Sequence, residues 1–518
     1  GRYLGSLIMT LFVFLSLPIG LMLGYGLSLI FGLHVDKFGP FSLWSYFQPF
    51  LFIAIPNILF AGSVFFALST LTKKVVYSYL GNIVLLVGYV VAINLIGDMD
   101  NLKIAALFDP FGIISLQQIV RYWTVSEFNT LLVTPDWLFM LNRVIWIGFG
   151  SLLMAFTLWK FSFTLPRTRK TKVKIDEISS LKSSLNDLLP KSIQQFSFSG
   201  HLKLMVKQAW LYFVGIIKDI AFVAIMLAGV GLVASGAISM GSRYSTDYLP
   251  VTYSMLESLG GSFVLFIYII LTFYSGELIW KERSVKLNQI YDTFPVPDWL
   301  SYSAKFLGMV FLTLFMLLLL MIICIGVQVS HSYYHFEIGQ YLFSLFVLEF
   351  SSYLLLIPVI LLIHSLSPNK FVGFVIVMVY YLLSSALPGI GVDDRLFVPL
   401  SGSSYVYSDM NGYGDYLTSF FWFTLYWGFF SVMLWLIGNA ALPRGTETTF
   451  KSIINRVRYR FKKRGLKYSL IVALVGFLFS GGFIWYNTHV INKFYSTKDG
   501  EKLAVKFENS YKFLKAKA

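Results

Sequence analysis

The chain has 518 residues, of which 57% are hydrophobic and only 13% are charged, and its formal net charge is +15. Soluble domains carry about 25% charged residues, so this composition excludes an ordinary soluble protein and predicts a polytopic membrane protein. The single cysteine, Cys324, excludes a disulfide or a thiolate metal site within one chain.

Eleven stretches of the chain are apolar enough, and at about 20 residues or more long enough, to cross a bilayer. They are continuously apolar and lack the alternation of barrel strands, so the predicted fold class is an all-α polytopic membrane protein. The expected spans are residues 6–31, 44–70, 75–97, 137–160, 211–238, 260–280, 303–328, 341–366, 370–390, 417–440 and 467–486.

Residues 98–136, between the third and fourth spans, are too polar to cross a membrane. Charged side chains occur there among aromatic ones, and Pro110 and Gly112 should interrupt its helices. Amphipathic helices with aromatic and charged edges suit the boundary between bilayer and water. A purely structural lid is one interpretation of this segment.

The positive charge is concentrated in two intervals. Residues 164–205 contain eight Lys or Arg against three acids, and residues 441–467 contain nine against one. Both intervals fall on the same side in the eleven-span count, and the positive-inside rule makes that side cytoplasmic. The C-terminus is then outside. Because topology already explains these charges, nucleic-acid binding is disfavoured.

Residues 281–300, between the sixth and seventh spans, have the pattern of a short amphipathic cytoplasmic helix. Pro295 and Pro297 should end this helix before Trp299 anchors the next span at the interface. Residues 196–210 read as an interfacial elbow helix ahead of the fifth span.

Three acids, Glu349, Asp219 and Glu277, lie within or beside the expected spans and need an explanation, because a charge at mid-membrane costs roughly 2.5–3.5 kcal/mol on insertion scales. Glu349 is the deepest, whereas Glu277 lies close to a membrane exit. Gln48 occupies a comparable position to Glu349 in the first half of the chain. Contact with a polar substrate is one interpretation of Glu349, and pairing with a polar neighbour on another helix is the favoured one.

The sequence also contains an internal repeat. Four similar pairs occur in the same order: residues 1–5 and 304–308, Ile55-Pro56 and Ile357-Pro358, LFDP at 107–110 and LFVP at 396–399, and GFGS at 148–151 and GFFS at 428–431. The copies start six spans apart, an even number, so they form a parallel repeat. The first copy has four spans against six and begins at Gly1, so we expect that its first two spans are missing.

Motifs in both copies resemble those of one membrane-protein family. They are DPFG at 109–112, RYWT at 121–124, EFNT at 127–130, Asn142-Arg143, GELIWKER at 276–283 and PVPDW at 295–299. This layout is similar to permeases of the type-two ATP-binding-cassette (ABC) exporter family. It is most similar to the bacterial fusions in which such a permease precedes a zinc aminopeptidase.

The resemblance implies six segments. Residues 1–163 would be a first permease repeat lacking its first two spans, 164–205 a basic cytoplasmic linker and elbow helix, 206–440 the second repeat, 441–466 a second basic cytoplasmic linker, 467–486 the last transmembrane helix, and 487–518 an extracytoplasmic linker toward a missing domain.

The family places a pair of short helices outside the membrane before the last span of each half, which corresponds to residues 98–136 and 391–416. The implied extracytoplasmic gate residues are Asp109, Pro110, Gly112, Arg121, Trp123 and Glu127. The family's coupling helix, which contacts the ATPase, corresponds to residues 281–300. The implied coupling residues are Lys281, Glu282, Arg283, Asp292, Pro295, Pro297 and Trp299.

The resemblance further implies a multi-pass permease subunit of the bacterial inner membrane, in contact with membrane lipids, that moves an unidentified substrate. The chain has no GxxxxGK[ST] motif, so ATP and Mg would be bound by two copies of a separate cytosolic ABC ATPase. It has no HExxH motif either, so zinc and enzymatic activity would belong to an absent aminopeptidase domain. No catalytic residue, cofactor or metal site is expected in this chain.

Two other functions stay open. The chain could be a membrane anchor or regulator of a fused extracytoplasmic aminopeptidase, and nothing in the spans excludes this. It could also be an ATP-independent secondary transporter, but that class predicts embedded charge pairs and short loops, and here intramembrane charge is sparse.

Overall fold

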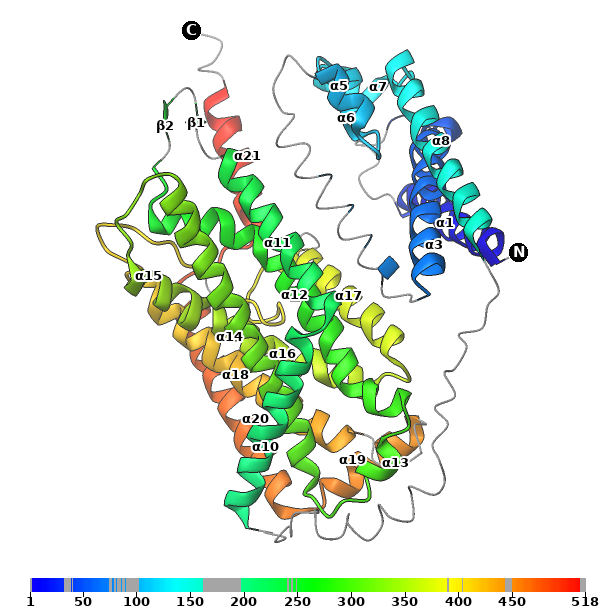
Figure 1. Cartoon of the computed structure of the whole chain (residues 1–518). Helices are drawn as coiled ribbons and strands as arrows, with labels where there is room; N and C mark the ends of the chain where they lie inside the picture. The colour runs from blue at the N-terminus through cyan, green and yellow to red at the C-terminus, as the bar shows by residue number, and fades with distance from the viewer. Residues whose placement is uncertain are drawn as a thin grey trace, which may run out of the picture. The chain divides into compact units, whose positions relative to one another are not determined.

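The computed structural model describes residues 2–31, 39, 41–73, 77–78, 81, 85, 89, 102–161, 197–239, 242–243, 246–247, 249–388, 391–402, 404–442 and 450–512. The described chain is almost wholly helical (Figure 1). It divides into two compact units, which we call unit 1 (residues 1–193 and 223–246) and unit 2 (residues 194–222 and 247–518).

Eight helices of the described chain are long and apolar enough to cross a membrane, and a ninth span results if one bent helix pair is counted. This confirms the predicted all-α, polytopic architecture. The expected span at 370–390 is a shorter apolar helix, α17(Lys370–Ala386). The expected span at 75–97 lies mostly outside the described residues, as does most of the linker at 164–205.

Unit 1 is built around one long apolar helix that contains a π-helical turn. The segments α2(Leu43–Pro49), η2(Phe50–Ala54) and α3(Ile55–Thr72) follow one another without a break. The other helices of the unit are α1(Arg2–Ile30), α5(Leu102–Phe108), α6(Ile113–Val120), α7(Val125–Thr130) and α8(Trp137–Lys160). The closest packing is between α3 and α8, where a Cβ on Gly150 would lie 3.3 Å from the Phe60 backbone.

Unit 2 is a bundle whose central helix is α14(Asp298–Ser330), in contact with helices on several sides. Its other helices are α10(Phe198–Ile217), α12(Thr252–Ser284), α13(Asn288–Tyr291), α15(Ile338–Phe343), η4(Ser344–Glu349), α16(Phe350–Leu366), α17, α18(Tyr416–Ala441), α19(Phe450–Arg460), α20(Arg464–Trp485), η6(Tyr486–Ile491) and α21(Thr497–Tyr511). As in unit 1, a π-helical turn interrupts a span, at η4, and a second π-helical turn, η6, ends the span that begins at Arg464.

The division between the units falls within α11(Ile220–Ser239), which is followed by the two-residue strands β1(Ser242–Arg243) and β2(Thr246–Asp247). The predicted boundary between an elbow helix at 196–210 and a span at 211–238 is wrong. One helix, α10, covers 198–217, and the chain then bends by 65° into α11. The bend lies at Asp219, whose carboxylate accepts from the Ala221 N–H and the Tyr274 hydroxyl and so replaces helical backbone bonds.

The residues of 391–416 that the structure describes form turns and one isolated bridge between Ser408 and Gly412. The expected pair of short helices is therefore not formed by described residues 391–402 and 404–415. Gly412 and Gly414 have positive φ angles of 60° and 49°, a conformation that a continuing α-helix does not accommodate.

Candidate functional site

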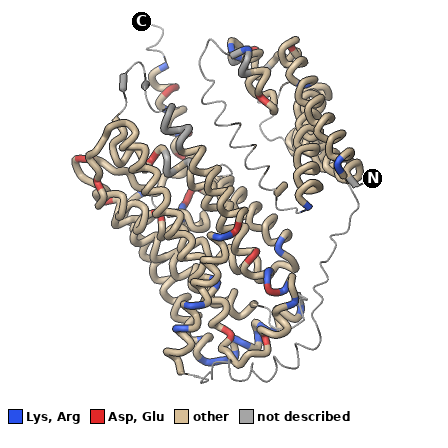
Figure 2. Tube along the Cα trace, in the orientation of Figure 1, with Lys and Arg blue, Asp and Glu red and all other residues tan. Residues whose placement is uncertain are grey.

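Lys and Arg gather at the end of unit 2 where α13 and α19 lie (Figure 2). We call this the basic end. It contains a buried ion pair, in which Lys305 Nζ lies 3.0 Å from Glu282 Oε2. The Lys305 side chain is 2% exposed, and its ammonium also donates to the Leu278 carbonyl at 2.5 Å. A buried charge is stable only when it is paired and hydrogen-bonded, and both conditions hold for Lys305.

A chain of hydrogen bonds extends this ion pair to three further side chains. Tyr212 donates to Glu282 Oε1 at 2.7 Å, and Gln208 Nε2 donates to the hydroxyls of Tyr212 at 2.8 Å and Tyr291 at 2.6 Å. These residues lie on α10, α12, α13 and α14. We call these five residues the basic-end network: Lys305, Glu282, Tyr212, Gln208 and Tyr291. It ties the segment between α12 and α14 to the centre of the bundle.

That segment exposes apolar side chains. Lys286 has a φ of +58°, which turns the chain from α12 into the single turn of α13. The large apolar side chains of the segment are between 49% and 67% exposed, namely Val285, Leu287, Ile290 and Phe294. The separate amphipathic helix expected here is reduced to this single turn, because residues 281–284 continue α12; Pro295 and Pro297 then precede α14, which begins at Asp298.

The predicted coupling residues have different environments. Glu282 belongs to the basic-end network, whereas Lys281 is exposed and Arg283 is half-buried with Asp292 in electrostatic range. Pro295 is exposed beside α13. Trp299 packs on Phe198 of α10, with ring centroids 6.1 Å apart.

The second basic interval contains a residue with a structural role. Arg460, on α19, pairs with Asp298 at 3.5 Å and donates to the carbonyls of Asn439, Ala440 and Leu442 at the end of α18. Since the last carbonyls of a helix have no intrahelical partner, this guanidinium caps α18. Its pairing with Asp298 also fixes the start of α14 beside α19.

In unit 1, the DPFG and Asn142-Arg143 motifs form one buried cluster. Asn142 Nδ2 donates to the carbonyls of Ala106 at 2.6 Å, Leu107 at 3.1 Å and Asp109 at 2.7 Å. Asp109 is 3% exposed and accepts from the N–H groups of Phe111 and Ile114, which starts α6. Asn142 thus joins the end of α5 to α8.

Arg143 completes the cluster by packing on Gly112. Its guanidinium donates to Asn142 Oδ1 and to Asn57 Oδ1. Gly112 has a φ of +73°, and any Cβ there would overlap the Arg143 guanidinium. Pro110 lies in the preceding turn. The left-handed conformation favours glycine at position 112, and a larger residue would also have to displace the Arg143 guanidinium.

Of the remaining expected gate residues, Glu127 lies on α7, and Arg121 and Trp123 lie just before it, so the described residues 102–136 contain three short helices where a pair was expected. Thr124 and Glu127 make a capping box: the Thr124 N–H donates to Glu127 Oε2 at 2.7 Å and the Glu127 N–H to Thr124 Oγ1 at 3.3 Å. Trp123 packs on Phe128, and Arg121 lies over the Tyr122 ring in the preceding turn.

We expect α7 to loosen at low pH. The hydrogen bonds from Thr124 lower the pKa of Glu127, so this carboxylate stabilises α7 above its unfolded pKa of about 4.3, and the stabilisation is lost as the pH falls through the lower folded pKa. Hydrogen exchange of residues 125–130, corrected for the intrinsic rate, measures this. Glu127→Gln keeps the cap but cannot titrate, so a similar pH dependence in that variant would contradict the assignment.

Gln48, Glu277 and Glu349 each have a partner. Gln48 is buried and donates to the Val133 carbonyl, and Glu277 pairs with Lys370 at the start of α17. Glu349 accepts from the Tyr405 hydroxyl at 2.7 Å. The pairing interpretation of Glu349 fits this bond, although its partner comes from the 391–416 insert and not from another span.

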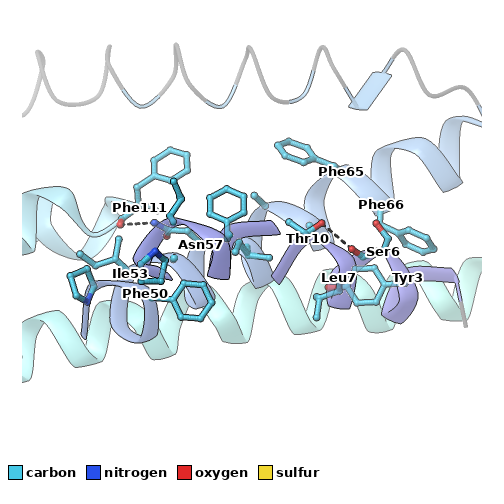
Figure 3. Close-up of a pocket in the computed structure, with 18 of the residues that line it drawn as sticks. Tyr3, Ser6, Leu7, Thr10, Phe50, Ile53, Asn57, Phe65, Phe66 and Phe111 are labelled. Carbon is cyan, nitrogen blue, oxygen red and sulfur yellow. Dashed lines mark hydrogen bonds between the residues drawn. The ribbon is translucent and has the colours of Figure 1, made fainter. Parts of the chain in front are cut away.

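A large apolar cavity of about 1070 Å³ lies in unit 1 between α1 and the α2–η2–α3 helix (Figure 3). Phe50, Ile53, Phe65 and other apolar side chains line it. Asn57 lies at one end, where it donates to the Phe111 carbonyl at 3.2 Å. Walls of this composition favour an apolar occupant.

Sequence reasoning missed the role of Lys305, which it used only as a marker of the repeat. The sequence signal that could have indicated this role is that Lys305 is followed by three apolar turns of the same helix, where an unpaired charge would be costly. Asn57 was also missed, and it lies in an apolar stretch with no pattern that marks it. Among the described residues, no three His, Cys, Asp or Glu side chains are placed to hold a metal ion.

Comparison with protein-family models, with curated proteins and with solved structures finds no match to this chain.

Proposed function

We propose that this chain is the membrane-spanning permease of an ATP-driven exporter, with two related halves and a separate cytosolic ATPase that docks at the basic end. The observation that carries the proposal is the segment between α12 and α14. It combines exposed apolar side chains, suited to a protein partner, with a rigid attachment to the bundle core through Tyr291 and the basic-end network.

A pair of equivalent hydrogen bonds supports the proposal that the chain has two related halves. Trp146, two residues before the GFGS motif, donates from Nε1 to the carbonyl of Leu107 at 3.1 Å. Tyr426, two residues before GFFS, donates from its hydroxyl to the carbonyl of Leu396 at 3.3 Å. Leu107 and Leu396 are the first residues of the matched LFDP and LFVP motifs. The same contact therefore joins the same two motifs in each unit.

Helix packing gives the halves further support. The span with the Ile-Pro pair packs closely on the span with the GF-containing motif in both units, α3 on α8 and α16 on α18. In both units the first of these spans also contains a π-helical turn, at η2 and at η4. A third π-helical turn, η6, ends the span that begins at Arg464, so such turns are not confined to the two matched spans.

The proposal predicts that the native protein, extracted in mild detergent, is isolated with two copies of an ATP-hydrolysing subunit per chain. Ile290→Glu should abolish this association, because Ile290 is 62% exposed and a carboxylate there would have to be desolvated in the interface. The measurement is the stoichiometry of co-purified subunits together with ATP hydrolysis.

The matched control is Ile454→Glu on α19, an exposed isoleucine at the same end but outside the segment. It should retain the ATPase. Recovery of the intact parent without any ATPase would contradict the proposal and favour the anchoring function. Retention of the ATPase by Ile290→Glu would show that the docking surface lies elsewhere.

A further inference from the structure

A second cavity, of about 590 Å³, lies in unit 2 toward the start of α12, at the opposite end of that helix from Glu282. Its walls come from α12, α14, the α15–η4–α16 helix and the insert at 404–413. The volume is within the range of small-molecule sites, about 300–1,000 Å³. The apolar part of the wall consists of Leu256, Val264, Leu317, Leu320, Leu345 and Val406.

The charged side chains in the described wall are all negative. Two carboxylates, Glu257 and Glu349, line the cavity, and none of the described lining residues is Lys, Arg or His. Arg395 donates to Ser404 at 3.3 Å but is not itself a lining residue. Burial and the carboxylates of Glu337 and Asp409 raise the pKa of Tyr407, so the surroundings of this ring are negative as well.

Tyrosine rings form much of the remaining wall. Tyr407 stacks on Tyr253 with centroids 6.0 Å apart and makes an edge contact with Tyr413 at 5.3 Å. Tyr413 in turn lies 5.9 Å from Tyr405. We call these four residues the tyrosine cluster. The insert thereby packs onto α12, and π-faces are placed close to Glu349.

Glu349 is held in position by the tyrosine cluster, since Tyr405 donates to its Oε1 at 2.7 Å. Burial, together with the nearby Glu349, raises the pKa of Tyr405, so its hydroxyl keeps its proton and remains a donor at neutral pH. On the same wall, both amide atoms of Gln340 are buried without a hydrogen-bond partner among the described residues. An unsatisfied buried amide is costly, which favours a ligand with a polar group here.

We infer that this cavity binds an organic cation with an apolar body. A cation gains from the Glu349 carboxylate and from the faces of the tyrosine rings, which attract positive charge through their quadrupoles. An anion of the same shape would meet two carboxylates and no cationic side chain among the described lining residues. Calling this cation the exported substrate rests on the proposed function, whereas its binding does not.

The test compares two ions of nearly identical shape and opposite charge, tetraphenylphosphonium and tetraphenylborate. Binding to the purified full chain in detergent is measured by titration calorimetry, with the heat of protein-free micelles subtracted. We expect the phosphonium to bind at least about tenfold more tightly than the borate. Glu349→Gln should weaken phosphonium binding by about tenfold or more, because a charge-assisted contact is replaced by a neutral one.

Glu277→Gln is the matched control, because Glu277 is also a carboxylate of unit 2 but does not line the cavity. It should leave phosphonium affinity unchanged. Should Glu349→Gln fail to fold, Tyr407→Leu removes one ring of the tyrosine cluster at a partly exposed loop position, and about threefold to thirtyfold weaker binding is expected.

Equal affinity for the two ions would overturn the inference, as would unchanged phosphonium binding in the folded variants. Because no ATPase is present in this assay, loss of cation binding and loss of ATPase association are separate results. Either proposal can therefore fail while the other survives.

Discussion

Lys305→Met is expected to lower the free energy of unfolding of unit 2 by about 3–5 kcal/mol, because it leaves the Glu282 carboxylate largely buried without its cation. The measurement can use a probe that the chain already contains. Cys324 is the only cysteine, is fully buried and lies on α14 with Lys305. Its reaction with a thiol-reactive dye during heating or denaturant titration in detergent therefore reports the opening of this helix.

Two variants separate the ion pair from a general effect of substitution. Lys281→Met removes an exposed lysine next to Glu282, and its effect should stay within about 0.5 kcal/mol. The double variant Lys305→Met with Glu282→Met should recover much of the lost stability, since an apolar pair is nearly neutral relative to a buried ion pair. A double variant no more stable than Lys305→Met would refute this account.

Asn142→Ala is expected to open the α5–α6 region of unit 1, at a cost of about 3 kcal/mol. Asn142 is fully buried and bonds to three carbonyls, two of which belong to α5, and it also accepts from Arg143. Its removal leaves several buried polar groups unsatisfied, each worth about 1–3 kcal/mol before the chain relaxes. Hydrogen exchange of the amides in α5 and α6 should then accelerate by about 100-fold.

Gln117→Ala is the control for this experiment, because Gln117 is an exposed amide on α6. It should leave exchange in α5 unchanged. Unaltered protection of α5 in Asn142→Ala, or an equal loss in Gln117→Ala, would show that Asn142 does not hold this region together.

The approximate positions of the eight long apolar helices were predictable because hydropathy depends on each residue's own chemistry. The boundary of α10 was not predictable. The apolar pattern continues without interruption from the expected elbow helix, and the break depends on the hydrogen bond between Asp219 and Tyr274, which is 55 residues away in the sequence. The insert at 391–416 was also misjudged, because the expected helices were transferred by resemblance although Gly412 and Gly414 favour turns.

The partners of individual side chains were likewise not predictable when they lie far away in the sequence. Glu349 was recognised as a costly charge, but its partner Tyr405 lies 56 residues further on in an insert without periodicity. The DPFG and Asn142-Arg143 motifs are separate in the sequence, and only the packing of α5 on α8 shows that they form one cluster. The repeat, the docking of an ATPase and the substrate stay predictions.

The π-helical turns η2 and η4 have a consequence for how this sequence can change over evolution. Each turn holds about one residue more than an α-helical turn, and a helix rotates by about 100° per residue. The extra residue sets the angle between the parts of the helix before and after it. Gln340 can thereby line the cavity while Leu355 accepts from Ser431 on α18. Many substitutions in η4 would preserve that angle, but losing a single residue there would turn one of these faces away from its neighbour.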